Sequence, residues 1–445
     1  MGQTTTIATR PPTRERAAVT AWPMLLVWMA LMVWMALIVA AHLVLVDLVQ
    51  SGAHLRIPFP PLDAALDWRP GYALVLPLAV GVVVVRWAAT VCARASWRFV
   101  VVGASLVTVA WDVSLALLDG FEGIVGSVTL KNEYFLDVAR VRDPVAFLGG
   151  FTAHIAEYRI HVQGHPPGFL LLLSLLDRIG LGSPWVVAAI EIAGSAVAVA
   201  AVLVTVRDVA GEHLARRAAP FVAVAPVAIW MVTSADAFFA GVGACAVALV
   251  VLATARTGVR STRFACAGGV LFGAVMFLSY GLVLLAIIPT AVALHRRRLQ
   301  PLVAAGLGAA AVVAAFAVAG FWWLDGLEAT RARYAAGVAS RRPYWPFLLA
   351  DIACLAVVLG PAIAVALARL RDRRMWWVVG GALVAIAVAA VSGMSKGEVE
   401  RIWLPFAIWV LPAGAVLAAD RRGARWLGAQ VGFTIFLQTL VRSPW

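Results

Sequence analysis

The sequence predicts an all-α bundle of transmembrane helices that crosses a bilayer about thirteen times. Three observations predict this fold class. Hydrophobic residues make up 63% of the chain and charged residues only 13%, which leaves more apolar surface than a soluble domain of this size can bury. The apolar residues form long runs, as membrane-spanning helices require. Short arginine clusters separate the runs, as membrane topology requires.

The apolar runs give the expected spans in order, and several are shorter than the roughly 20 residues of a straight span. The first run, from about Ala21 to Val46, is too long for a cleaved signal peptide, and no small-residue cleavage site follows it. We therefore expect a disordered cytoplasmic tail over 1–20 and one transmembrane domain over 21–445. The predicted spans are 21–48, 72–91, 98–118, 183–206, 217–232, 236–255, 263–279, 281–295, 301–323, 345–369, 375–392, 402–419 and 425–441.

The basic clusters fix the predicted orientation. With the N-terminus inside, every second loop is basic and therefore cytoplasmic, by the rule that cytoplasmic loops carry excess Lys and Arg. This pattern predicts a multi-pass protein of the plasma (inner) membrane. The clusters are Arg86/Arg94/Arg98, Arg207/Arg216/Arg217, Arg256/Arg260/Arg263, Arg296/Arg297/Arg298, Arg371/Arg373/Arg374 and Arg421/Arg422/Arg425.

The same pattern settles two ambiguous stretches. Residues 264–295 must form two short helices broken near Ser279-Tyr280-Gly281, because one helix would place the Arg296 cluster outside. Gly168–Gly180 is too short for a span, and a span there would invert the orientation of everything after it. We expect an interfacial or partly inserted helix at that position.

Net charge and cysteine usage exclude two other classes. The chain has a net charge of +13, but its basic residues lie between apolar runs, so we expect no nucleic-acid partner. Cys92, Cys245, Cys266 and Cys354 lie in or beside apolar runs, with spacing that fits neither a zinc site nor a disulfide framework. We expect no cofactor and assign no metal ligands; a requirement for a divalent metal stays open.

Three segments are expected on the external face: a large loop over 119–182, Asp325–Tyr344, and Ser392–Arg401. The large loop contains Asp119, Glu133 and Asp137 as acidic candidates. On an α-helix Glu133 and Asp137, four residues apart, would share a face. Such a pair can act as a general base and its neighbour or bind a cation, whereas singly each residue is equally explained as a solvated loop acid.

The other two external segments are basic, against the trend of the rest of the chain. Arginine can bind a phosphate or diphosphate through two parallel hydrogen bonds; alternatively these side chains extend to lipid headgroups within an aromatic belt. Arg401 is the strongest phosphate candidate because it begins an apolar helix. The further cations are Arg331, Arg333, Arg341, Arg342 and Lys396.

His165-Pro166-Pro167-Gly168 precedes an apolar helix, and the prolines favour a rigid helix start. His165 is then either the cap of that helix or a ligand of a lipid phosphate at headgroup depth. Asp236 is expected at an external turn, as a helix cap or a site residue. Asp47 and Asp112 lie in or at the end of apolar helices, where a carboxylate usually has a partner or a task.

Six elements of the sequence follow one another in a characteristic order. They are Asn132-Glu133-Tyr134, His165-Pro166-Pro167-Gly168, Gly180-Leu181-Gly182-Ser183-Pro184-Trp185, Arg207, Thr233-Ser234-Ala235-Asp236 and Ser279-Tyr280-Gly281. In this order the chain resembles the polytopic glycosyltransferases of the GT-C superfamily, most closely the branch with the protein O-mannosyltransferases and the lipid A aminoarabinose transferase. The likeness covers about 119–295 and is looser afterwards.

The resemblance implies a GT-C-like fold and an inverting sugar transfer on the external face. The donor would be a polyprenyl-phosphate sugar and the acceptor a cell-envelope glycan, lipid or protein. Glu133, Asp137 or Asp119 would hold the catalytic role. Arg401, Lys396, His165, Arg341 and Arg342 would bind the donor phosphate, and Tyr134, His161, Asp236 and Tyr280 would line the substrate pocket.

The chain departs from the family in two ways. Asn132 stands where the family has the aspartate of its acidic element, and two extra spans precede the large loop. Two other hypotheses therefore stay open. One is a transporter or lipid flippase, although such folds usually show repeats and midplane charges. The other is a membrane scaffold that keeps the fold without the chemistry.

Overall fold

The computed structural model of the chain describes residues 14–53, 55, 57–232, 234–418 and 423–443. Residues 1–13 of the expected tail, Thr233 of the expected external turn, and Arg421 and Arg422 of the last basic cluster lie outside these described residues. Helix α1 begins at Arg14, so residues 14–20 of the expected tail are helical and α1 extends several residues ahead of the apolar run.

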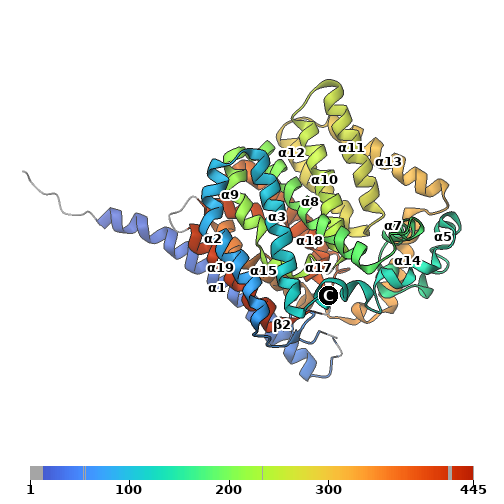
Figure 1. The fold of residues 1–445 in the computed structure, drawn as a ribbon, viewed down its shortest axis with the longest axis horizontal. Helices are drawn as coiled ribbons and strands as arrows, with labels where there is room; N and C mark the ends of the chain where they lie inside the picture. Colours follow the sequence, from blue (N-terminus) through green and yellow to red (C-terminus); the bar gives the residue numbers. More distant parts are fainter. Residues whose placement is uncertain (1–13, 54, 56, 233, 419–422, 444–445) are drawn as a thin grey trace, which may run out of the picture.

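The described residues form an all-helical bundle with one two-stranded sheet (Figure 1). Eight helices are long and apolar enough to cross a membrane, which makes this a multi-pass membrane protein by helix length and composition. They coincide with eight of the expected spans: Leu25–Gln50 within α1 (Arg14–Gln50), Tyr72–Arg94 containing α2 (Val75–Arg94), Trp97–Asp119 containing α3 (Trp97–Ala116), α8 (Pro184–Ala210), α10 (Ala235–Thr254), α13 (Gln300–Val318), α15 (Tyr344–Arg369) and α16 (Arg373–Val391).

The other expected spans are shorter, less apolar or broken. Two of them are discontinuous at prolines, which lack the N–H that an α-helix needs. The run 217–232 divides into α9 (Glu212–Ala223) and a 3₁₀ helix that starts at Pro226. The run 402–419 divides into α18 (Leu404–Ala407) and a 3₁₀ helix over Leu411–Val416. The runs near 263–279 and 425–441 form α11 (Gly258–Met276) and α19 (Gly423–Leu440).

The two ambiguous stretches have the predicted local structure. α11 ends at Met276, and a 3₁₀ helix (η7, Tyr280–Ala286) precedes α12 (Ile287–His295), so 264–295 is broken at the predicted position. α7 (Gly168–Arg178) has only 11 residues, too few to span a bilayer. The remaining helices are α4 (Glu122–Val125), α5 (Pro144–Gly150), α6 (Ile160–Gly164), α14 (Trp323–Ala336) and α17 (Val399–Ile402).

Small residues bring α8 and α10 together. A Cβ added to Gly194 would lie 2.5 Å from the carbonyl oxygen of Ala237, and one added to Gly241 would lie 2.6 Å from the carbonyl oxygen of Gly194. Only glycine permits this backbone approach, which is typical of helix pairs in membranes. The contact fixes the level of α8 relative to the start of α10.

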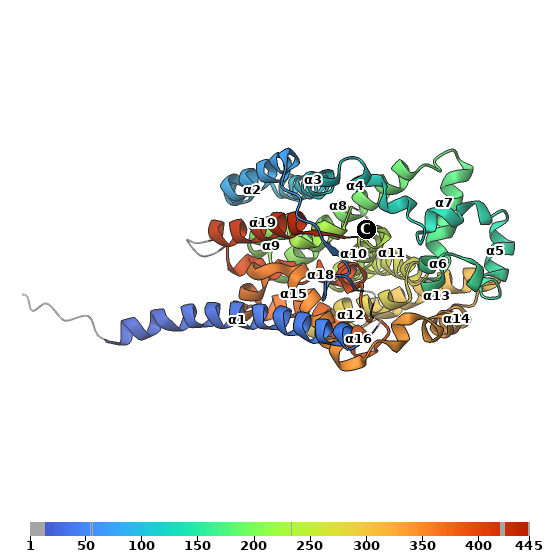
Figure 2. The same ribbon diagram turned by 90° about the horizontal axis from the view of Figure 1, so that it is seen from below.

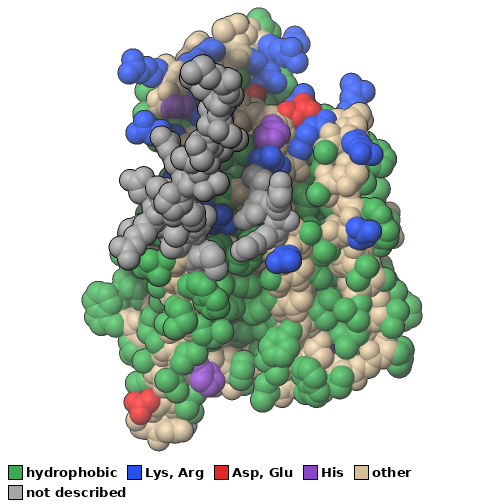
Figure 3. All heavy atoms as spheres, turned by 90° about the vertical axis from the view of Figure 1, so that its left-hand side faces the viewer, with side chains coloured by type: hydrophobic (Ala, Val, Ile, Leu, Met, Phe, Trp, Pro, Cys, Tyr) green, Lys and Arg blue, Asp and Glu red, His purple; other side chains and the backbone are tan. Residues whose placement is uncertain are grey.

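The basic turns meet at one end of the bundle. Arg296 Nη1 lies 2.8 Å from Asp208 Oδ2 and 2.9 Å from the Thr254 hydroxyl. Arg216 Nη1 donates to the carbonyl oxygens of Cys92 and Ala95. The bonds of Arg296 join the ends of α8, α10 and α12, and those of Arg216 join α9 to the end of α2. On the face shown in Figure 3, Lys and Arg side chains gather toward the upper end and hydrophobic side chains cover the lower part.

The three segments expected outside meet at the opposite end. The Thr330 hydroxyl donates to the carbonyl oxygen of Gln163, and the Tyr334 hydroxyl to that of Gly393. In both ribbon views α5, α7 and α14 gather at one end, while α1 lies along one side of the bundle (Figures 1 and 2). Strands β1 (Ala65–Leu66) and β2 (Val441–Arg442) pair antiparallel, joining the loop after α1 to the end of α19.

Candidate functional site

Arg401, in α17, is the centre of a buried charge cluster. Its guanidinium lies 3.6 Å from Glu133 Oε1, 3.8 Å from Asp236 Oδ2 and 3.8 Å from Glu398 Oε2. Its Nη2 lies 2.9 Å from Nε2 of His161. The side chain is 3% exposed. Arg401, Glu133, Asp236, Glu398 and His161 are called the arginine cluster below.

His161 connects the acid and the arginine. Its Nδ1 lies 2.7 Å from Glu133 Oε1. A guanidinium can only donate, so Nε2 must accept from Arg401 and Nδ1 must carry the hydrogen that is donated to Glu133. His161 thus links the carboxylate of Glu133 to the guanidinium of Arg401.

Glu133 is held in its charged form. Burial works against ionisation, but His161 and Arg401 outweigh it, so the pKa of Glu133 lies below its usual value. Burial also disfavours the charge of Arg401, yet Asp236, Glu133 and Glu398 outweigh this and raise its pKa. Glu133 is thus an ionised carboxylate at neutral pH, able to accept a proton.

The large loop positions this acid by aromatic packing. The ring of Tyr134 packs edge-on against Phe169 at 5.0 Å and lies 6.2 Å from the ring of His161. His165 Nδ1 bonds the carbonyl oxygen of His161 at 2.8 Å. His165 makes no cap hydrogen bond to α7, so the cap interpretation was wrong. Burial lowers its pKa, and a neutral imidazole has no charge to offer a phosphate.

Two helices supply carboxylates from the membrane side. The Ser234 side chain caps α10 and bonds Asp236 Oδ2 at 2.9 Å. Glu191, in α8, is 3% exposed and interacts electrostatically with Glu133, Asp236 and Arg401. The sequence analysis missed Glu191, although a carboxylate in an apolar helix is the same signal that singled out Asp112. Asp112 itself accepts a hydrogen bond from Ser195 at 2.6 Å.

Glu133 and Asp137 do not act as a pair. Residues 134–140 form a 3₁₀ helix (η4) rather than an α-helix, so residues four apart do not share a face. Asp137 Oδ2 instead accepts the backbone N–H of Arg159 at 2.6 Å, and its Oδ1 lies 3.0 Å from Arg140. Asp137 therefore holds the loop together, away from the arginine cluster.

A second group contains cations. Arg342 donates to the carbonyl oxygens of Leu55 and Lys396, and Lys396 Nζ donates to that of Arg342 at 3.0 Å. Arg341 is exposed at the end of its 3₁₀ helix. In the described part of the chain, none of these three cations lies within 4.0 Å of a carboxylate. Arg342, Lys396 and Arg341 are called the cation group.

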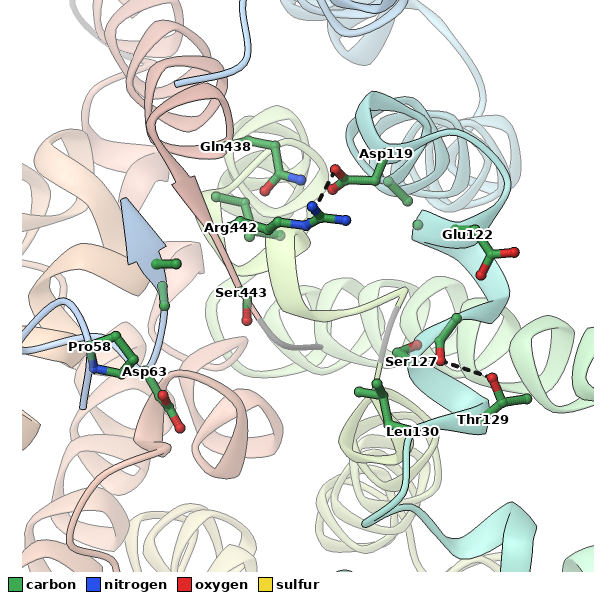
Figure 4. Close-up of a pocket in the computed structure, with 16 residues that line it drawn as sticks. Pro58, Asp63, Asp119, Glu122, Ser127, Thr129, Leu130, Gln438, Arg442 and Ser443 are labelled. Carbon is green, nitrogen blue, oxygen red and sulfur yellow. Dashed lines mark hydrogen bonds and ion pairs between the residues drawn. The ribbon is translucent and has the colours of Figure 1, made fainter. Parts of the chain in front are cut away.

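A cavity of about 610 Å³ lies between the loop after α1, the segment after α3 and the end of α19 (Figure 4). Asp63 lines it, and the backbone N–H of Asp63 donates to Glu400 Oε1 at 2.9 Å, one residue from Arg401. Burial and Glu398 raise the pKa of Asp63 to about 6, against Arg342 and Arg401. Burial raises the pKa of Glu400 to about 7.

Asp119 also lines this cavity but is strongly paired. Both of its carboxylate oxygens accept from Arg69, and Arg442 lies 3.9 Å away.

Tyr280 lies elsewhere, against Trp323 of α14 with ring centroids 5.4 Å apart. Among the proposed site residues, the structure brings Glu133, Tyr134, His161, His165, Asp236 and Arg401 together. It leaves Asp119, Asp137 and Tyr280 outside that group.

The sequence analysis missed Asp63 and Glu398. Asp63 lies in the loop after the first span, beside Pro60 and Pro61, where an acid looks like an ordinary solvated residue. Within the described ranges, no three His, Cys, Asp or Glu side chains form a group that could hold a metal ion.

No protein-family model matches the chain, and no curated protein matches its sequence.

Proposed function

We propose that this protein is a GT-C-type glycosyltransferase that moves a sugar from a polyprenyl-phosphate donor to an acceptor, with inversion. The observation that carries the proposal is the position of residues 396–401. At one end of this segment Lys396 belongs to the cation group, and at the other Arg401 centres the arginine cluster. A sugar transfer from a lipid phosphate needs cations at the leaving group and a base at the acceptor, side by side.

Glu133 is the base in this proposal. It is ionised, oriented by His161, and close to the external end of α10. Asp137 is committed to Arg159 and Arg140, and Asp119 to Arg69. Neither can accept a proton without breaking an existing interaction. Glu133 instead lies against His161, whose Nδ1 is 2.7 Å from its Oε1.

The cation group receives the leaving phosphate. Because Arg342 and Lys396 donate to carbonyl oxygens rather than carboxylates, their charges remain available to an anion. The acceptor hydroxyl gives its proton to Glu133, and its oxygen forms a bond to the anomeric carbon. The bond from that carbon to the phosphate oxygen breaks, and the polyprenyl phosphate leaves with the electron pair.

The proposal places this end of the bundle on the external face of the plasma (inner) membrane. The basic turns gather at the other end, and cytoplasmic loops are the ones that carry excess Lys and Arg. The donor then reaches the site from the outer leaflet, and the acceptor is a glycan, lipid or protein of the cell envelope.

The test uses purified protein in proteoliposomes with polyprenyl-phosphate mannose and polyprenyl-phosphate arabinose as donors. Release of polyprenyl phosphate in the presence of membrane extract measures transfer. We expect Glu133→Gln to lower transfer by at least 100-fold, within the 10²–10⁴-fold range of general-base catalysis. Glu157→Gln is the matched control, because Glu157 is a 61% exposed glutamate of the same loop.

Equal activity of Glu133→Gln and the wild type would exclude Glu133 as the base. Transport is the competing function, favoured by the buried carboxylates Asp112 and Asp351 within candidate spans. Movement of an intact lipid-linked sugar across the proteoliposome membrane without release of polyprenyl phosphate would favour transport and contradict the transferase proposal.

A further inference from the structure

The cavity that Asp63 and Asp119 line is large enough for a ligand. Its volume of about 610 Å³ falls within the range of roughly 300–1,000 Å³ that is typical of small-molecule sites. Its walls come from the loop after α1, from the segment after α3 and from the end of α19 (Figure 4). These segments are held together by the pairing of β1 with β2 and by Arg69, which bonds Asp119 and the carbonyl oxygens of Gln438 and Val441.

Two hydroxyl groups of the cavity wall, those of Ser127 and Ser443, have no hydrogen-bond partner among the described residues. Ser127 lines the cavity and is 7% exposed, and its Oγ has no hydrogen-bond partner among the described residues. A buried hydroxyl without a partner costs about 1–3 kcal/mol. Rotation of the Ser127 hydroxyl, which is shielded from solvent, into the cavity would let a ligand hydroxyl satisfy it, because a hydroxyl both donates and accepts.

The charges of the wall select the kind of ligand. Asp63, Asp119 and Glu122 supply carboxylates, and Arg442 is the single cation among the described lining residues. Asp119 is compensated by Arg69 and Arg442, while Asp63 and Glu122 are not. A phosphate in this cavity would face carboxylates, whereas an uncharged hydroxyl can donate to them. The other polar lining side chains are Thr129, Gln438 and Ser443.

We infer that this cavity is a binding site for a neutral, hydroxyl-rich ligand of the saccharide class. Ser127 and Asp63 contact its hydroxyl groups, and the donor phosphate lies outside it, at the cation group. The wall connects to the arginine cluster through Asp63 and Glu400, and through Leu130, whose carbonyl oxygen accepts from the N–H of Glu133. The identification of this ligand as the acceptor sugar rests on the proposed function. The binding of a saccharide in the cavity does not depend on that function.

The experiment measures binding in the absence of donor and turnover. Three probes share one ring and differ in charge: glucose, glucosamine and glucose 6-phosphate. Saturation-transfer NMR with the full chain in nanodiscs reports their binding. We expect a signal from glucose that is at least fivefold stronger than that from glucose 6-phosphate. Ser127→Ala weakens glucose binding, and Ser114→Ala, a buried serine that bonds Trp111 instead, leaves it unchanged.

A second pair of variants tests whether filling the cavity with a large side chain prevents binding. Ala65 lines the cavity from β1, and the next residue, Leu66, does not. Both are exposed positions of one strand, where successive side chains point to opposite faces. Ala65→Trp therefore abolishes glucose binding, while Leu66→Trp retains it.

Stronger binding of glucose 6-phosphate than of glucose, or glucose binding that survives both Ser127→Ala and Ala65→Trp, would overturn the inference. Displacement of glucose by a glucosyl diacylglycerol in the nanodisc supports the site and identifies a lipid-borne saccharide. Lack of displacement supports the site with a soluble or polymeric saccharide. Sugar binding without any transfer activity would refute the proposed transferase function and leave this site standing.

Discussion

Nη2 of Arg401 and Nε2 of His161 lie 2.9 Å apart although 240 residues separate them in the chain. This contact joins the large loop to the segment Ser392–Arg401, the last of the three expected outside. Because both side chains also meet Glu133, one acid, one histidine and one arginine form a closed set of contacts. The relation makes Arg401 a residue that fixes the geometry of Glu133, in addition to being a cation.

Replacing Arg401 should destabilise the protein strongly. Arg401→Met leaves Glu133 and Asp236 buried without their cation, and loss of one partner from a buried ion pair costs about 3–5 kcal/mol. Thermal unfolding in nanodiscs, followed by tryptophan fluorescence, measures the effect. Arg374→Met is the control, since Arg374 is 55% exposed in its pair with Asp372 and should cost less than about 1 kcal/mol. Similar shifts for both variants would show that the cluster is not a stabilising centre.

The close contact between α8 and α10 should tolerate no side chain. Gly194→Val places atoms where the backbone of Ala237 and Phe238 lies, 2.5 Å from the Cβ position. We expect loss of monodisperse protein in size-exclusion chromatography, and loss of transfer activity in any protein that remains, because Glu191 and Asp236 lie on these two helices. Gly306→Val in α13 is the control, as no atom lies within 4 Å of its Cβ position. Normal assembly of Gly194→Val would contradict this packing.

The pKa of Asp63 predicts a pH-dependent stability. Its folded value of about 6 exceeds the ordinary aspartate value of 3.8, so the folded state keeps a proton that the unfolded state releases. The folded state therefore loses stability as pH rises from about 4 to about 6. Asp63→Asn removes this loss, so its melting temperature should exceed that of the wild type at pH 7.5, and the difference should shrink toward pH 4. A constant difference between pH 4 and pH 7.5 would refute the assignment.

The orientation can be tested with single cysteines in a chain lacking Cys92, Cys245, Cys266 and Cys354. Glu157→Cys lies at the end with the three external segments, and Gln300→Cys lies at the end with the basic turns. A membrane-impermeant maleimide added to intact cells should label Glu157→Cys and leave Gln300→Cys unlabelled until the cells are opened. The reverse pattern would invert the topology and place the arginine cluster on the cytoplasmic side.

The sequence predicted the long spans because hydrophobic length is a local property. It also predicted the break near Tyr280, because the alternation of basic and non-basic loops along the whole chain required two helices there. The discontinuity of the runs 217–232 and 402–419 was not predicted, because average hydrophobicity does not register the effect of Pro226 or Pro412 on backbone hydrogen bonding. A similar limit applied to Glu133 and Asp137: their spacing suggested a shared helical face, but the loop forms a 3₁₀ helix.

The site was predicted in its parts but not in its contacts. Glu133, His161, Asp236 and Arg401 were each singled out by residue type and position, yet nothing local to any of them indicates that Arg401 lies beside His161. Asp63 was missed because its significance comes entirely from distant residues: burial against Glu398 and a bond to Glu400. Contacts that join segments hundreds of residues apart have no local pattern.

The pairing of β1 with β2 has a consequence for the order in which the protein matures. Ala65 faces Arg442 across this small sheet, and Arg69 reaches the carbonyl oxygens of Gln438 and Val441. The loop after the first helix can therefore pair with β2 only after residue 442 has been synthesised, when every later helix has already been made. Until then the cavity lacks the wall that the end of α19 provides. A nascent chain can thus occupy the membrane with all its long helices in place and still be unable to hold a ligand.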